Sequence, residues 1–195
     1  MNLRRLHRKT ALIFTVPLLL TALTGISYRI GRSWFGLTDE FGELMMILHE
    51  GRFLGKPMVP VYVLLLGLGL LSITISGIAL VKRRKKTAIS KSGNLNARRL
   101  HQFIAPFAAL PFFITSFTGI FYRLGKDWLG LSNEQASFLL KIHQGSYLGS
   151  TLRPIYVLFL GVTLITMLLT GIKISGVSRR HSSQGMKSNY SNLHN

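Results

Sequence analysis

Cysteine is absent from this chain, and acidic residues are few. Without cysteine, it can form no disulfide, hold no iron–sulfur cluster or thiolate zinc, and use no thiol nucleophile. Charged residues make up 15% of the chain, against about 25% in a typical soluble domain, while 48% of its residues are hydrophobic. A nucleic-acid-binding protein with so basic a balance would be less apolar. The composition therefore predicts a protein whose partner is the lipid bilayer, with no nucleic acid.

Four apolar segments are long enough to cross a membrane, which takes roughly 20 helical residues. Each contains glycine or proline, which membrane helices tolerate because their neighbours satisfy the freed backbone groups. The sequence predicts an all-α, four-helix membrane bundle. The predicted spans are residues 10–30, 59–81, 103–124 and 154–174.

The first half of the chain is repeated in the second half. Arg-Arg-Leu-His begins at Arg4 and again at Arg98, an offset of 94 residues, at which roughly 30 of 77 aligned positions are identical. The basic N-terminus resembles a cleavable signal, but its copy lies in mid-chain, so we expect the first span to be retained. The predicted parts are a two-span repeat (1–81), a basic linker (82–97), a second two-span repeat (98–175) and a disordered tail (176–195).

The charges predict how the bundle sits in the membrane. Because each repeat has two spans, both enter in the same orientation, related by an axis along the membrane normal. By the positive-inside rule we expect both termini and the basic linker to be cytoplasmic, in a bacterial inner or thylakoid membrane. The two outward loops then hold all six acids, Asp39, Glu40, Glu43, Glu50, Asp127 and Glu134.

Each outward loop has the signals of a short helix. Thr38 and Ser132 are suitable N-caps, and Gly51 and Gly145 are suitable residues to end the helices. The apolar residues between them have helical spacing, which predicts amphipathic helices packed on the bundle with His49 and His143 able to point inward. The expected apolar face consists of Phe41, Leu44, Met45 and Leu48, with Phe138, Leu139 and Ile142 in the second repeat.

Four histidines carry the candidate chemistry, two at identical positions in each repeat. His7 and His101 lie at the cytoplasmic ends of their spans, whereas His49 and His143 lie outward. Roughly 30 Å of helix separates the two levels, so each histidine can pair only with its counterpart in the other repeat. The alternative for each is a hydrogen-bonded interfacial histidine. The remaining two, His181 and His194, are in the polar tail and are expected to be exposed.

The facing histidines have no cysteine and no set of inward carboxylates beside them. Such a pair suits axial ligation of a haem better than it suits a zinc site or a di-iron carboxylate centre. Two pairs predict two haems, one near each face. Gly25, Gly119, Gly77 and Gly171 could make room for the macrocycles, or could serve tight helix packing. Arg29 and Arg123 could pair with haem propionates, or could reach lipid phosphates.

The recurring strings resemble the PepSY-associated transmembrane helix family over residues 4–175. They are Arg-Arg-Leu-His before a span that ends in Thr-Gly, followed by His-x-Gly-x-x-Leu-Gly and a second span. The family includes bacterial ferric-siderophore reductases with a four-helix core holding two bis-histidine b haems. The resemblance implies that His7, His49, His101 and His143 are the ligands and that ferric iron or a ferric chelate is the electron acceptor. The outward loops are too short for the periplasmic PepSY domain of larger members.

The sequence therefore predicts a di-haem b-type membrane protein that transfers electrons across the membrane, an oxidoreductase of the ferric-reductase kind. It has no nucleotide or flavin fingerprint, so the donor would be a quinol, a partner protein or another soluble carrier. The alternative is a non-catalytic accessory subunit or assembly factor of a larger membrane complex, with structural histidines.

Overall fold

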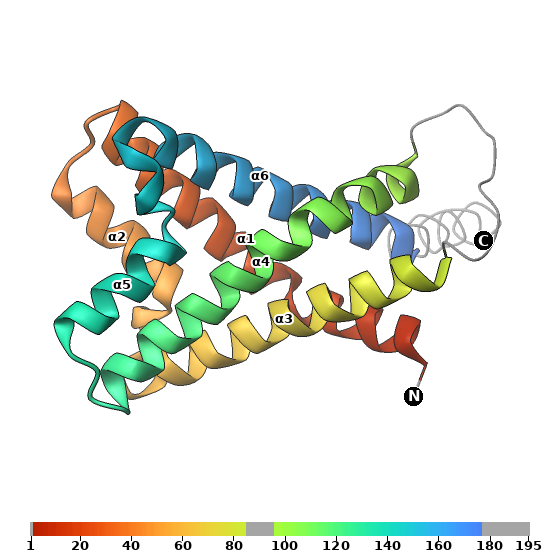
Figure 1. The fold of residues 1–195 in the computed structure, drawn as a ribbon, viewed down its shortest axis with the longest axis horizontal. Coiled ribbons are helices and arrows are strands. Elements are labelled where there is room, and N and C mark those ends of the chain that lie inside the picture. The colour runs from red at the N-terminus through yellow and green to blue at the C-terminus, as the bar shows by residue number, and fades with distance from the viewer. Residues whose placement is uncertain (1, 85–95, 177–195) are drawn as a thin grey trace, which may run out of the picture.

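The computed structural model describes residues 2–84 and 96–176. Within them, four long helices are apolar enough to cross a membrane, so the predicted all-α membrane bundle is confirmed. Figure 1 shows their arrangement. The four are α1 (Leu3–Trp34), α3 (Val59–Arg84), α4 (Ala97–Asp127) and α6 (Gly149–Ser175).

Three of the four helices run beyond the predicted apolar spans at both ends, and α3, which begins at the predicted residue, does so only at its C-terminal end. α3 continues into the predicted linker as far as Arg84, and α4 begins at Ala97, one residue before the predicted second repeat. Pro17 does not interrupt α1, and neither Pro106 nor Pro111 interrupts α4. Residues 85–95 of the linker and residues 177–195 of the tail, which include His181 and His194, lie outside the described residues.

The bundle has two diagonally opposed pairs of helices. α1 packs against both α3 and α6, and α4 packs against the same two helices. Equivalent helices of the two repeats, α1 with α4 and α3 with α6, therefore occupy opposite corners. Between them lies an apolar core whose most buried members include Leu18 and Phe112, themselves equivalent positions of the two repeats.

Glycine permits close contact between the two repeats. A Cβ atom at Gly67 in α3 would lie 2.4 Å from Ile120 in α4. The equivalent Gly161 in α6 would bring one 2.5 Å from Ile26 in α1. Such distances are shorter than any real side chain tolerates, so these two glycines serve tight helix packing.

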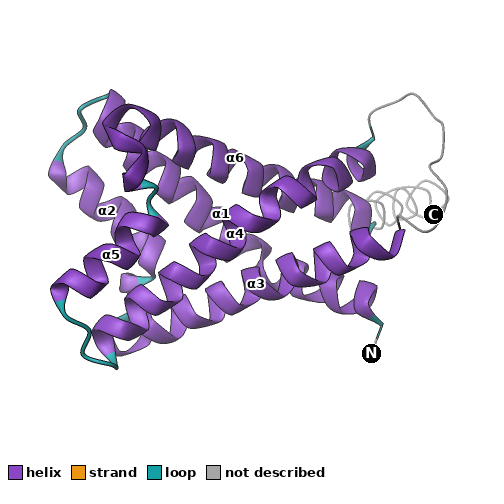
Figure 2. Cartoon of the chain, viewed as in Figure 1, coloured by secondary structure: helices purple, strands orange, loops and turns teal. Residues whose placement is uncertain are grey.

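Two short helices lie at the same end of the bundle, opposite the end that holds the N-terminus (Figure 2). They are α2 (Asp39–Glu50) and α5 (Asn133–His143). The predicted caps are confirmed: Thr38 and Ser132 accept hydrogen bonds from backbone N–H groups of the first turn. Gly51 and Gly145 follow the helices with positive φ angles, as expected. The 3₁₀ turns η1 (Arg52–Leu54), η2 (Lys56–Met58) and η3 (Ser146–Leu148) lead from these helices to α3 and α6.

The predicted apolar face of the short helices was partly wrong. Leu44 is 51% exposed and Phe138 is 64% exposed. The residues buried against the bundle are instead the small Gly42 and its equivalent Ala136. Small side chains let α2 and α5 approach α1 and α4 closely, whereas exposed apolar side chains are ordinary in a protein surrounded by lipid.

Candidate cofactor site

The structure brings His7 and His101 together at one end of the bundle. They extend from the diagonally opposed helices α1 and α4, and the centres of their rings are 6.5 Å apart, with ring planes at 82°. This is the pairing that the 94-residue repeat predicted, because equivalent positions meet across the bundle axis.

A hydroxyl group holds each of these rings through its Nδ1 atom. Nδ1 of His7 is 2.9 Å from Oγ of Ser76, and Nδ1 of His101 is 2.9 Å from Oγ1 of Thr170. The Ser76 and Thr170 hydroxyls donate to carbonyls of their own helices, so each accepts the Nδ1–H of the histidine. Within the residues that the structure describes, Nε2 of neither ring makes a hydrogen bond, which leaves its lone pair free.

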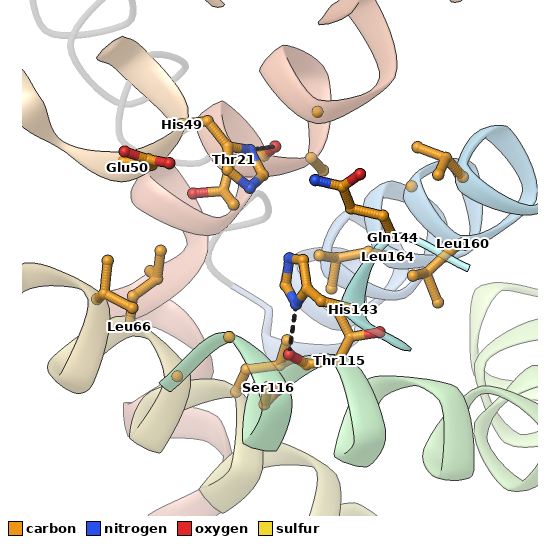
Figure 3. A pocket seen from close by; sticks show the side chains of 18 of the residues that line it. Thr21, His49, Glu50, Leu66, Thr115, Ser116, His143, Gln144, Leu160 and Leu164 are labelled. Atoms are coloured by element: carbon orange, nitrogen blue, oxygen red, sulfur yellow. Dashed lines mark hydrogen bonds between the residues drawn. The ribbon is translucent and has the colours of Figure 1, made fainter. Parts of the chain in front are cut away.

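At the opposite end, His49 of α2 and His143 of α5 are held in a similar way. Nδ1 of His49 donates to the Thr21 carbonyl and Nδ1 of His143 to the Thr115 carbonyl, both at 2.9 Å. Because a carbonyl can only accept, Nδ1 must carry the proton. Figure 3 shows the other ring nitrogens turned toward each other across a cavity.

A glycine beside each histidine leaves room for the imidazole ring to reach its hydrogen-bond acceptor. Gly25 lies one helical turn after Thr21, and Gly119 lies one turn after Thr115. Cβ atoms at these glycines would lie 3.1 Å and 3.0 Å from Cε1 of His49 and His143. Gly77 and Gly171 face His7 and His101 in the same manner, at 3.3 Å and 3.7 Å. The sequence suggested that these four glycines could make room for a macrocycle. In the structure, the space beside each of them is next to an imidazole ring.

A cavity of about 220 Å³ separates His49 from His143. One water needs only about 10 to 15 Å³ of such space, so the cavity has room for a much larger occupant. Its walls are mostly apolar, which lowers the pKa of His49 to about 4 through desolvation, with a further contribution from His143. Desolvation likewise lowers the pKa of His143. Both imidazoles are therefore neutral, which is the form that binds metals. The lining includes Leu18, Leu66, Leu70, Phe112, Leu160 and Leu164.

Arg29 and Arg123 also line this cavity, and each contacts the residue that follows the histidine of the other repeat. Arg29 donates to Oε1 of Gln144 at 3.1 Å. Arg123 pairs with Glu50 at 3.5 Å and with Asp127 at 2.9 Å. Desolvation raises the pKa of Glu50, partly offset by Arg123 and Arg52. The two contacts are equivalent in the repeat, but only one is ionic.

His7 and His101 are separated by the distance expected for two ligands to one metal ion. Two metal–nitrogen bonds of about 2.0 to 2.1 Å, with about 1.1 Å from each nitrogen to its ring centre, place the ring centres about 6.3 Å apart. The observed separation of 6.5 Å for His7 and His101 is close to this. In the described ranges no three His, Cys, Asp or Glu side chains gather as a metal site. The side chains that could hold a metal there are therefore the two imidazoles.

The acceptors of the Nδ1 protons were not predicted from the sequence as partners of histidine. For His7 and His101 the signal was present, since Ser76 and Thr170 both carry a hydroxyl at equivalent positions, whereas Thr21 and Thr115 accept through backbone carbonyls that any residue has. Nothing in the sequence alone, however, distinguishes these two hydroxyls from hydroxyls that bond only to their own helix.

These features define a multi-pass, all-α membrane protein with two symmetric histidine pairs. A profile of the PepSY-associated TM region matches residues 29–138, from the end of α1 to within α5. The match covers more than half of the chain, and the protein belongs to this family. No curated protein and no solved structure matches the chain.

Proposed function

We propose that the protein binds two b-type haems, one between His7 and His101 and one between His49 and His143, and moves electrons across the membrane. A single observation carries the proposal. All four histidines bond to the protein through Nδ1, Nε2 of each makes no hydrogen bond within the described residues, and the four form two facing pairs. Metal-bound histidines are typically oriented through their second nitrogen in this way.

The surroundings of His49 and His143 suit a haem. The cavity between them is apolar and has arginines at its edge, which is the combination that a flat apolar ring with carboxylate groups requires. A bis-histidine haem supplies reversible one-electron chemistry. The protein's own contribution is to fix both imidazoles, keep them neutral and exclude water from the apolar walls.

The placement of the pairs supports transfer across the membrane rather than along one face. His7 and His101 lie near the start of α1 and α4, whereas His49 and His143 belong to the short helices at the far end. We propose that the basic ends face the cytoplasm, by the positive-inside rule. A quinol or a partner protein would donate the electrons, and ferric iron or a ferric chelate is the proposed acceptor.

The experiment is to purify the full chain in detergent after expression with adequate haem supply. We expect a red protein with about two haems per chain and the spectrum of six-coordinate, low-spin iron. A folded protein that takes up no haem, even on titration with hemin, would refute this function and favour a structural role for the histidines in a larger membrane complex.

A further inference from the structure

The two sides of the cavity between His49 and His143 are related by the repeat but differ in charge. On the side of Arg123, two arginines meet three carboxylates. Arg123 pairs with Glu50 and Asp127, while Arg52 pairs with Glu50 at 3.2 Å and with Glu43 at 2.6 Å. On this side the carboxylates therefore outnumber the arginines, and each arginine is ion-paired.

On the side of Arg29, every partner in that network is replaced by a neutral residue. The residue that contacts Arg29 is Gln144, the counterpart of Glu50. The counterparts of Asp127, Glu43 and Arg52 are Ser33, Ser137 and Ser146.

A second arginine adds to the positive charge on this side. Arg153 stands where the first repeat has Val59, and it is close enough to Arg29 for their charges to repel. Among residues 2–84 and 96–176, neither Arg29 nor Arg153 has a carboxylate partner. Two half-buried arginines without a counter-ion are unfavourable unless an anion joins them.

We propose that the cavity binds its occupant in one orientation, with the carboxylate groups of a tetrapyrrole at Arg29 and not at Arg123. This inference rests on the proposed function, and it assigns an anion-recognising role to one of the two equivalent arginines. Arg29 lines the cavity itself, and its planar guanidinium can bind a carboxylate through two hydrogen bonds.

Because Glu50 and Gln144 are equivalent positions of the repeat and nearly equal in size, their side chains can be exchanged to test the proposal. Gln144→Glu gives Arg29 the carboxylate that Arg123 already has, and Glu50→Gln removes it from Arg123. The full chain, freed of haem, is titrated with hemin and with hemin dimethyl ester, which lacks the charged carboxylates. Absorbance of low-spin haem gives the affinity of each, in variants that retain His7 and His101 as an internal reference site.

We expect Gln144→Glu to weaken hemin binding at the His49–His143 site by about 10-fold or more, the worth of a charge-assisted hydrogen bond. It should leave the affinity for the dimethyl ester unchanged. Arg29→Gln should behave in the same way. Adding Glu50→Gln and Asp127→Ser to Gln144→Glu should restore the preference for hemin, because together they remove both carboxylates from Arg123 and move the anion site to the opposite side.

The inference would be overturned if the Gln144→Glu protein lost affinity for hemin and for the dimethyl ester equally. It would also be overturned if this protein lost affinity for neither compound. A wild-type protein that binds both compounds equally at this site would also overturn it, while leaving the proposed haem function intact. Failure of the wild-type protein to bind either compound would instead refute the proposed function.

Discussion

Gly25 of α1 lies directly against the imidazole of His49: a Cβ atom at position 25 would be 3.1 Å from Cε1 of the ring. In a helix, the side chain at position i+4 stands beside the carbonyl of residue i, and Gly25 is at i+4 from Thr21. The missing side chain thus exposes the very carbonyl that His49 binds. The second repeat uses Gly119, Thr115 and His143 identically.

Gly25→Ala should shift the His49 ring and weaken its bond to Thr21. We expect the affinity for haem at the His49–His143 site to fall by about 10-fold or more, as for other lost orienting contacts, while the His7–His101 site keeps its haem. Hemin titration followed by absorbance measures both. The matched control is Gly171→Ala, whose Cβ would be an ordinary 3.7 Å from His101. Equal effects of the two substitutions would contradict this explanation.

The Ser76 hydroxyl should support haem binding only because its oxygen accepts the Nδ1 proton of His7. Ser76→Ala removes the acceptor of the Nδ1 proton, and we expect a loss of about 10- to 100-fold in haem affinity at that site. Ser76→Thr should preserve binding, because the equivalent residue Thr170 already serves His101. A Ser76→Ala protein with unchanged haem affinity and spectrum would argue against this hydrogen bond as an orienting contact.

The histidines should act in the two observed pairs. His7→Ala and His101→Ala should each disturb the same haem, and the double variant should do little more, since residues that act as one unit are non-additive. His49→Ala and His143→Ala should behave likewise for the other haem.

Haem content per chain, measured with low-spin absorbance, should fall from about two toward about one when either pair is removed. Loss of both haems from a folded His7→Ala, His101→Ala protein would contradict one site at each end of the bundle.

The contact between Gly67 and Ile120 should be a determinant of stability. Gly67→Ala forces a Cβ to within 2.4 Å of Ile120, and such overpacking costs about 1 to 3 kcal/mol. In an Ile120→Ala background the same change should be neutral or stabilising, because alanine has the higher helix propensity by about 1 kcal/mol. Thermal unfolding in detergent tests this. An equal cost in both backgrounds would show that Ile120 is not the obstacle.

The distribution of charge predicts that the acidic and basic ends face opposite sides of the membrane. Compartment reporters inserted in residues 39–43 and in residues 82–86 should report opposite sides, with the second cytoplasmic. Reporters on one and the same side would overturn both the topology and the proposal of transfer across the membrane.

Several features followed from the sequence alone. Apolar runs of membrane-spanning length determined the four helices, because lipid leaves a buried backbone no alternative to internal hydrogen bonds. The caps Thr38 and Ser132 set where the short helices begin, since capping is a local interaction. The 94-residue repeat was sufficient to pair His7 with His101 and His49 with His143, because symmetry makes equivalent residues meet across an axis.

Only the tertiary structure decided which partners those residues contact. Hydrophobicity favoured Leu44 and Phe138 as the packed face of the short helices, yet close packing selected Gly42 and Ala136, because in a membrane protein apolar side chains have no need to face inward. Likewise Arg29 and Arg123 are identical in the repeat, and one faces a neutral amide while the other is ion-paired. That difference depends on which helices lie side by side, a non-local relationship that no spacing along the chain encodes.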